Sequence, residues 1–177
     1  MADRIVMDAS VAVAYLRDEV GTANARSAVT GWAEASTEVL VPSHFWLEIS
    51  NVLVGSYSLS PTAIVEHFVD LDSLGVRTIE PDRPLLLLAI DQMVGAHLSA
   101  YDAIYLALAL STNSQLATLD RRLAEAAGDA GILLGAGGPR LMAETSASYG
   151  SDRPDYTGWA HTATVGAHIA ELRRQVS

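Results

Sequence analysis

The stretch of residues 98–123, LSAYDAIYLALALSTNSQLATLDRRL, decides the fold expected of this chain. It places Asp102 at the start of the apolar run 103–110, which is typical of the first turn of a buried helix. Asp120 follows the short apolar segment 116–119, which indicates a strand. A helix start and the carboxyl end of a strand are positions where α/β proteins carry functional side chains. The alternative for each aspartate alone is a helix N-cap, a role that suits Asp.

Working outward from this stretch, short apolar strands alternate with helical segments along most of the chain. Strands are predicted at residues 4–7, 39–41, 76–79, 116–119 and 132–134, with helical patterns between them. Ser43 is predicted to cap the helix that follows the second strand, and Leu106 and Leu110 are predicted to lie in the core. This alternation predicts an α/β fold in which helices flank a central, mainly parallel sheet.

The composition changes at Gly135, after which a Gly-rich segment is typical of a linker. We therefore predict one domain over residues 1–134 and an extension over 135–177, with a helix from residue 161 to 175. This final helix would pack on the domain, pair with another chain or bind a partner.

The charge balance limits the classes of function that this chain can have. Of 177 residues, 21 are acidic and 11 are basic, every basic residue is arginine, and the net charge is −10. An acidic chain binds nucleic acid poorly without help, so a nucleic-acid substrate would require a divalent metal, local arginines or a basic partner. With no cysteine, thiolate chemistry is excluded. No apolar run approaches the roughly 20 residues of a membrane span, and the first residues lack a signal peptide's apolar region, so we expect a cytoplasmic protein.

Four carboxylates are predicted to gather at one edge of the sheet: Asp8, Glu48, Asp102 and Asp120. Asp8 ends the first strand, and Glu48 lies on a helical face with His44 and Asn51, where the alternative is a solvated position. Two carboxylates about 5 Å apart repel by roughly 3 kcal/mol at an effective dielectric constant of about 20. A divalent cation would relieve this repulsion, and oxygen ligands favour Mg²⁺ or Mn²⁺. Such a site suits metal-assisted hydrolysis of a phosphodiester bond.

Four segments in order, VMDAS, PSHFWLEISNVL, LSAYDAIYLALAL and LATLDRRL, resemble those of PIN-domain endoribonucleases, and most closely those of the VapC toxins of type II toxin–antitoxin systems. The resemblance implies a PIN fold, Mg²⁺-dependent cleavage of RNA, a cognate VapB-like antitoxin and a homodimer. It implies that Asp8 and Asp102 are the principal metal ligands and that Asp120 completes the metal site. Glu48 would bind a second metal or orient the attacking water. The family also has polar positions that support the acids by hydrogen bonds, and in this chain they are matched by Ser10, Asn51 and Thr118.

Two other functions remain open: a housekeeping PIN nuclease without an antitoxin, and a non-catalytic PIN scaffold. A phosphatase of the haloacid-dehalogenase type is disfavoured because it needs a second acid two positions after Asp8, where this chain has Ser10. Arg121 and Arg122 are candidates for phosphate contact or, equally, a solvated pair. Histidines without the spacing of a zinc motif are interpreted as surface or capping residues: His44, His97 and His161.

Overall fold

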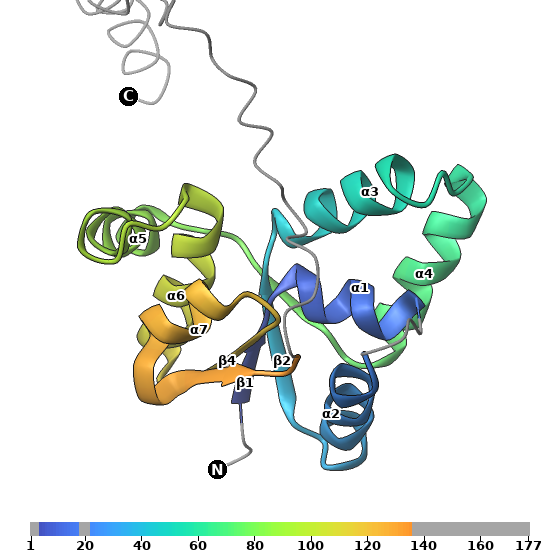
Figure 1. Cartoon of the computed structure of the whole chain (residues 1–177), viewed down its shortest axis with the longest axis horizontal. Coiled ribbons are helices and arrows are strands. Elements are labelled where there is room, and N and C mark those ends of the chain that lie inside the picture. Colours follow the sequence, from blue (N-terminus) through green and yellow to red (C-terminus); the bar gives the residue numbers. More distant parts are fainter. Residues whose placement is uncertain (1–3, 18–21, 136–177) are drawn as a thin grey trace, which may run out of the picture. The chain divides into compact units, whose positions relative to one another are not determined.

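A five-stranded sheet forms the centre of the computed structural model, which describes residues 4–17 and 22–135 (Figure 1). Each pair of neighbouring strands is parallel, and the order β3-β2-β1-β4-β5 places β1 in the middle. The strands are β1 (Arg4–Met7), β2 (Glu38–Pro42), β3 (Arg77–Ile79), β4 (Gln115–Thr118) and β5 (Gly131–Leu133). The predicted α/β fold is therefore confirmed, and the sheet is parallel throughout.

Helices cover both faces of this sheet, with α5, α6 and α7 on one side and α1 to α4 on the other (Figure 1). The helices of the described chain are α1 (Ala9–Arg17), α2 (Ala23–Glu34), α3 (Phe45–Gly55), α4 (Pro61–Ser73), α5 (Arg83–Gly95), α6 (Ala100–Thr112) and α7 (Arg121–Ala127). Because the strands are parallel, the turns that follow β1, β2 and β4 all open at the same edge of the sheet.

Residues 98–123 form α6, β4 and the start of α7. Ser99 caps α6 by accepting a hydrogen bond from the Asp102 N–H, and Asn113 ends the helix in the left-handed conformation. α6 packs against β1, β2 and β4, and every residue from Ala103 to Ala109 is buried. Leu106 is a core residue as predicted. The same prediction for Leu110 is wrong, since this side chain is 46% exposed one residue beyond the buried part of the helix.

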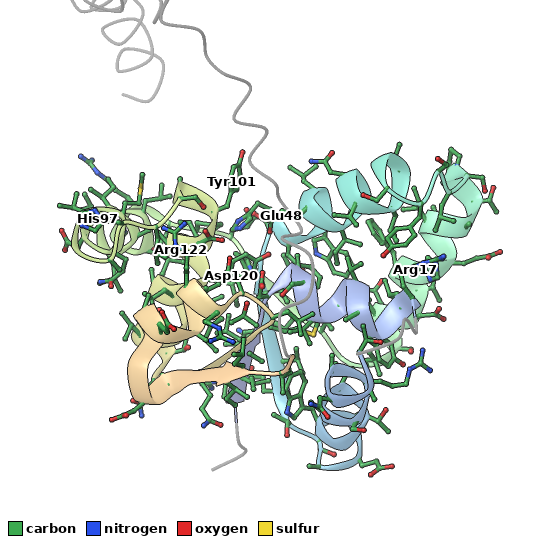
Figure 2. All side chains as sticks on the ribbon, viewed as in Figure 1. Arg17, Glu48, His97, Tyr101, Asp120 and Arg122 are labelled. Carbon is green, nitrogen blue, oxygen red and sulfur yellow. The ribbon has the colours of Figure 1, made fainter. Side chains whose placement is uncertain are left out.

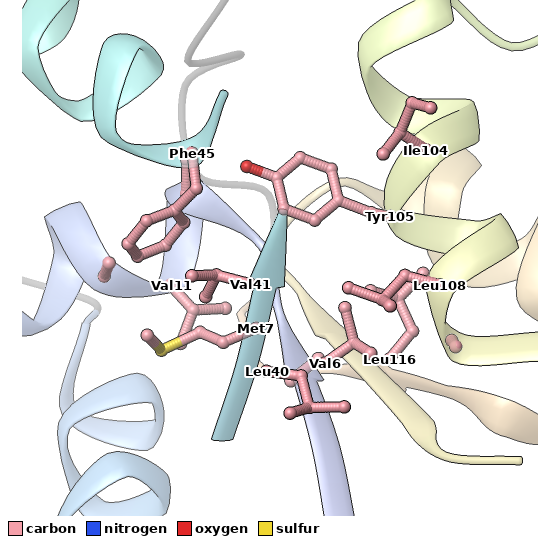
Figure 3. Packing of buried hydrophobic residues seen from close by; sticks show 14 of the residues in the cluster. Val6, Met7, Val11, Leu40, Val41, Phe45, Ile104, Tyr105, Leu108 and Leu116 are labelled. Carbon is pink, nitrogen blue, oxygen red and sulfur yellow. The ribbon is translucent and has the colours of Figure 1, made fainter. Parts of the chain in front are cut away.

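The core lies between the sheet and its helices (Figure 3). Strand residues such as Val6, Leu40 and Leu116 are at most 2% exposed and pack in one cluster with helix residues. Tyr105 belongs to the same cluster and is fully buried, and its hydroxyl oxygen points toward the start of α3 (Figure 3). A buried tyrosine hydroxyl normally has a hydrogen-bond partner, and here that partner belongs to the candidate site.

Other predictions differ from the structure in detail. The N-cap position of α3 is His44, not Ser43, and the His44 side chain makes no capping hydrogen bond. α5 begins at Arg83, where Asp82 caps it by accepting the Leu85 N–H and Pro84 suits the first turn. Among the described residues no single helix is long and apolar enough to cross a membrane, and α5 and α6 would reach that length only as a pair bent by 117°. The predicted final helix lies outside the described residues, and the boundary after residue 134 stays a prediction.

Candidate active site

Asp8 follows the central strand and is the most enclosed of the predicted acids. Its N–H donates to the Ala117 carbonyl of β4 over 3.0 Å, and the residue is only 8% exposed. The hydroxyls of Ser10 and Thr118 both donate to Oδ2 of Asp8, the second over 2.7 Å. Burial raises the pKa of Asp8 from 3.8 to about 6, although these hydrogen bonds oppose the shift.

The same two hydroxyls also hold the end of β4. Ser10 Oγ accepts the Leu119 N–H over 3.0 Å, and Thr118 Oγ1 accepts the Asp120 N–H over 2.9 Å. Each hydroxyl therefore joins the carboxylate of Asp8 to the backbone that leads to Asp120. The structure thus places Ser10 and Thr118 where they can support the acids. Asn51, by contrast, is exposed on α3, and no described hydrogen bond joins its side chain to an acid.

Glu48 lies in the first turn of α3, where that helix approaches α6 (Figure 2). It is 9% exposed, so the alternative of a solvated glutamate is wrong. The Tyr105 hydroxyl donates to Glu48 Oε2 over 2.5 Å, and His44 Nε2 lies 3.6 Å from the same oxygen. Burial, helped by the negative charges of Asp8 and Asp102, raises the pKa of Glu48 from 4.5 to about 7, although the hydrogen bond from Tyr105 opposes the shift.

His44 was predicted to be a surface or capping residue, and it does occupy the N-cap position of α3, but its half-buried side chain lies beside Glu48 and makes no capping hydrogen bond. Burial lowers the pKa of His44 to about 4, so the imidazole is neutral near pH 7 despite a hydrogen bond to the Tyr101 backbone. Its ring packs edge-on against Tyr105, with centroids 4.9 Å apart, and lies 5.4 Å from the ring of Tyr101. His44 therefore forms part of the wall around Glu48.

Asp102 occupies the first turn of α6 but is not its N-cap. Ser99 is the N-cap, and the two residues exchange hydrogen bonds: Ser99 Oγ donates to Asp102 Oδ2 over 2.9 Å and accepts the Asp102 N–H over 3.1 Å. The charge of Asp102 raises the pKa of both Asp8 and Glu48. Three carboxylates from separate elements thus lie close enough to repel one another.

Asp120 differs from these three acids. It is the N-cap of α7, and its Oδ1 accepts the N–H groups of Arg122 and Leu123 over 2.7 and 3.3 Å. Oδ1 of Asp120 therefore caps α7, which was the alternative expected for this aspartate. A metal-binding role for Asp120 stays a prediction. The Arg122 guanidinium donates to the His97 carbonyl over 3.1 Å, which ties α7 to the loop before α6 (Figure 2).

The donor set at this edge has the chemistry of a site for a hard divalent cation. Carboxylates that lie close together in a largely buried site are stabilised in the ionised form by a metal ion. In residues 4–17 and 22–135, however, no three His, Asp or Glu side chains stand in positions to hold one ion together. Asp8, Glu48 and Asp102 are the residues whose charges would be neutralised.

A sequence model of the PIN domain matches residues 5–129, which include all four predicted acids. The chain belongs to the PIN domain family. No curated protein matches the chain in sequence. Members of this family are typically metal-dependent ribonucleases, which accounts for the acids at the carboxyl edge of the sheet.

Solved structures share the PIN fold with this chain at low sequence identity. PAE2754 from Pyrobaculum aerophilum is 22% identical with a TM-score of 0.56, over 72% of this chain and 82% of its own. VapC20 of Mycobacterium tuberculosis, a toxin that cleaves the sarcin–ricin loop, is 20% identical with a TM-score of 0.57, over 75% and 99%. A toxin–antitoxin complex from Klebsiella pneumoniae gives 17% identity and a TM-score of 0.50, over 66% and 86%. These likenesses confirm the fold.

Two residues that contact the acids were not expected from the sequence, Ser99 and Tyr105, whereas His44 was expected on the same helical face as Glu48. The spacing Ser99-x-x-Asp102 is a capping-box pattern with Asp in place of Glu or Gln, and it could have indicated this pair. Tyr105 is the only polar side chain in the apolar run 103–110, which was a signal that it has a buried partner. Nothing in the local sequence indicated that this partner would be Glu48.

Proposed function

We propose that this PIN domain is a metal-dependent endoribonuclease that cleaves RNA by hydrolysis. One observation carries the proposal: Asp8, Glu48 and Asp102 come from three elements, and their negative charges act on one another in a largely buried environment. Folding does not require such a cluster, because buried carboxylates without a counter-charge destabilise a protein. A site that binds a cation explains why these acids are close together.

Within this proposal each acid has a separate task. Asp8 and Asp102 would hold Mg²⁺, or Mn²⁺, with Asp120 completing the site directly or through water. The metal supplies a lowered pKa for the attacking water and stabilises negative charge on the phosphate. Glu48 orients that water and takes its proton on a carboxylate oxygen, a task that suits a group whose pKa lies near 7.

We further propose that the enzyme is the toxin of a cytoplasmic toxin–antitoxin pair, inhibited by a VapB-like antitoxin, and that it forms a homodimer. The structural likeness to a VapC toxin and to a toxin–antitoxin complex supports this assignment. The charge of −10 also supports it, because a basic antitoxin segment would bind favourably to an acidic nuclease. Arg121, exposed beside the site, is a candidate for contact with an RNA phosphate.

Induced expression combined with an assay of the purified protein tests both levels of the proposal. Wild-type protein should arrest growth and cleave RNA in Mg²⁺ but not in EDTA, and Asp102→Asn should lose both properties. Asp91→Asn, which removes an exposed acid from α5, is the matched control and should behave as wild type. Cleavage without growth arrest would refute the toxin role and favour a housekeeping nuclease. RNA binding without cleavage in any divalent metal would refute the nuclease and favour a scaffold.

A further inference from the structure

Tyr105 lies near all the acids that interact with one another. Its own helix, α6, carries Asp102 one turn earlier. Its hydroxyl donates to Glu48 Oε2 on α3, and the negative charge of Asp8, like that of Glu48, raises the pKa of the phenol. One phenol group therefore joins α6 to α3 beside the turn between β1 and α1.

We propose that Tyr105 is a positioning residue that fixes the carboxylate of Glu48 relative to Asp8 and Asp102. The inference rests on the proposed function, because Glu48 needs a fixed position only if it acts together with those acids. Tyr105 would not touch RNA or metal, since the whole side chain is buried. Its effect on the reaction would pass through Glu48.

The hydrogen bond to Glu48 sets the direction of the single phenol proton. A tyrosine hydroxyl can donate once, and here it donates to Glu48 Oε2. This bond leaves Oε1 as the carboxylate oxygen that can face a water molecule. Burial and the neighbouring negative charges raise the pKa of Tyr105 well above its usual value, so the donor is retained at any pH near neutrality.

Packing holds the phenol ring in place. Tyr105 is among the largest fully buried side chains, and its neighbours come from the sheet and from α3 (Figure 3). The imidazole of His44 packs edge-on against it at 4.9 Å between centroids. A ring confined in this way cannot turn aside, so its hydroxyl holds Glu48 in one orientation.

Plain packing is the alternative, in which the phenol fills space and the hydroxyl only satisfies its own hydrogen-bonding capacity. Tyr105→Phe separates the two explanations because it keeps the ring and removes one oxygen. Tyr15→Phe makes the same chemical change on α1, where the half-buried Tyr15 ring lies against the Arg26 guanidinium. This variant is the matched control.

Two measurements on the full chain test the inference. For RNA cleavage, kcat should fall about tenfold in Tyr105→Phe and stay unchanged in Tyr15→Phe, as expected when a group that orients a residue of the site is lost, while KM stays within twofold. Calorimetry should show Mn²⁺ affinity within twofold of the wild-type value in both variants, because Asp8, Asp102 and Asp120 would hold the ion.

A double-mutant cycle with Glu48→Gln shows whether Tyr105 acts through Glu48. In the Glu48→Gln background, Tyr105→Phe should change the residual kcat by less than twofold. An equal loss of kcat in both backgrounds would overturn the inference, since the tyrosine would then act on the fold as a whole. A wild-type kcat in Tyr105→Phe would overturn it as well. If the wild-type protein neither binds Mn²⁺ nor cleaves RNA, the proposed function itself fails, and that result differs from the other two.

Discussion

Replacing Asp8 with asparagine should stabilise the metal-free protein at pH 8. The amide is close in shape to the carboxyl group and can still accept from Ser10 and Thr118, but it carries no charge. Burial places the pKa of Asp8 at about 6 in the folded protein, above the ordinary value of 3.8. The contribution of the wild-type side chain is therefore most favourable below about pH 4 and is lost as the pH rises through about 6.

The size of the effect follows from the pKa difference. A shift of roughly two units corresponds to about 3 kcal/mol of unfolding free energy once the pH is well above both values. Below about pH 4 the carboxyl group of Asp8 is protonated in the folded state and increasingly protonated in the unfolded state. The difference in unfolding free energy between wild type and variant should therefore shrink to less than about 1 kcal/mol. Since Asp8 is 8% exposed, solvent screening reduces these values little.

Urea denaturation of both proteins in EDTA, at pH 4 and pH 8, measures this difference. Saturating Mg²⁺ at pH 8 should reverse the order, because a ligand that binds only the folded wild type stabilises it. Destabilisation by Asp8→Asn in EDTA at pH 8 would refute the reasoning, and so would an equal effect at both pH values. Either result would mean that hydrogen bonds, not burial of charge, dominate the energetics of Asp8.

Four further substitutions test the surroundings of the site and the burial of α6. Thr118→Val should lower the unfolding free energy by about 1–3 kcal/mol, because it removes a buried donor to the Asp8 carboxylate. Thermal denaturation measures this loss, and an unchanged melting temperature would contradict the prediction. Ser99→Ala should cost about 1 kcal/mol of helix capping and lower the activity by releasing Asp102, which parallel stability and cleavage assays can separate. Leu106→Ala should cost about 2–5 kcal/mol in urea denaturation, while Leu110→Ala should cost under about 1 kcal/mol; equal losses would contradict the observed burial.

The alternation of elements and the local placement of the acids could be predicted from the sequence. Apolar segments at β1 and β4 locate Asp8, Thr118 and Asp120 because a strand end is a local feature, and parallel strands bring such ends to one edge. The capping role of Asp120 was likewise a local alternative. Asn51 shows the limit of helical spacing, since it shares a predicted face with Glu48 and yet lies exposed. Periodicity assigns a face to a residue, but the neighbouring elements determine how far that face is buried.

By itself the sequence determined that acids follow two strands and begin two helices of a parallel α/β fold, because these positions depend on neighbours within a few residues. Only the tertiary structure decided how the acids interact. Tyr105 reaches Glu48 across 57 residues, and Thr118 reaches Asp8 across 110. Such contacts depend on the approach of α6 to α3 and of β4 to β1. Burial, which determines the pKa of Asp8 and Glu48, likewise exists only after the elements have packed.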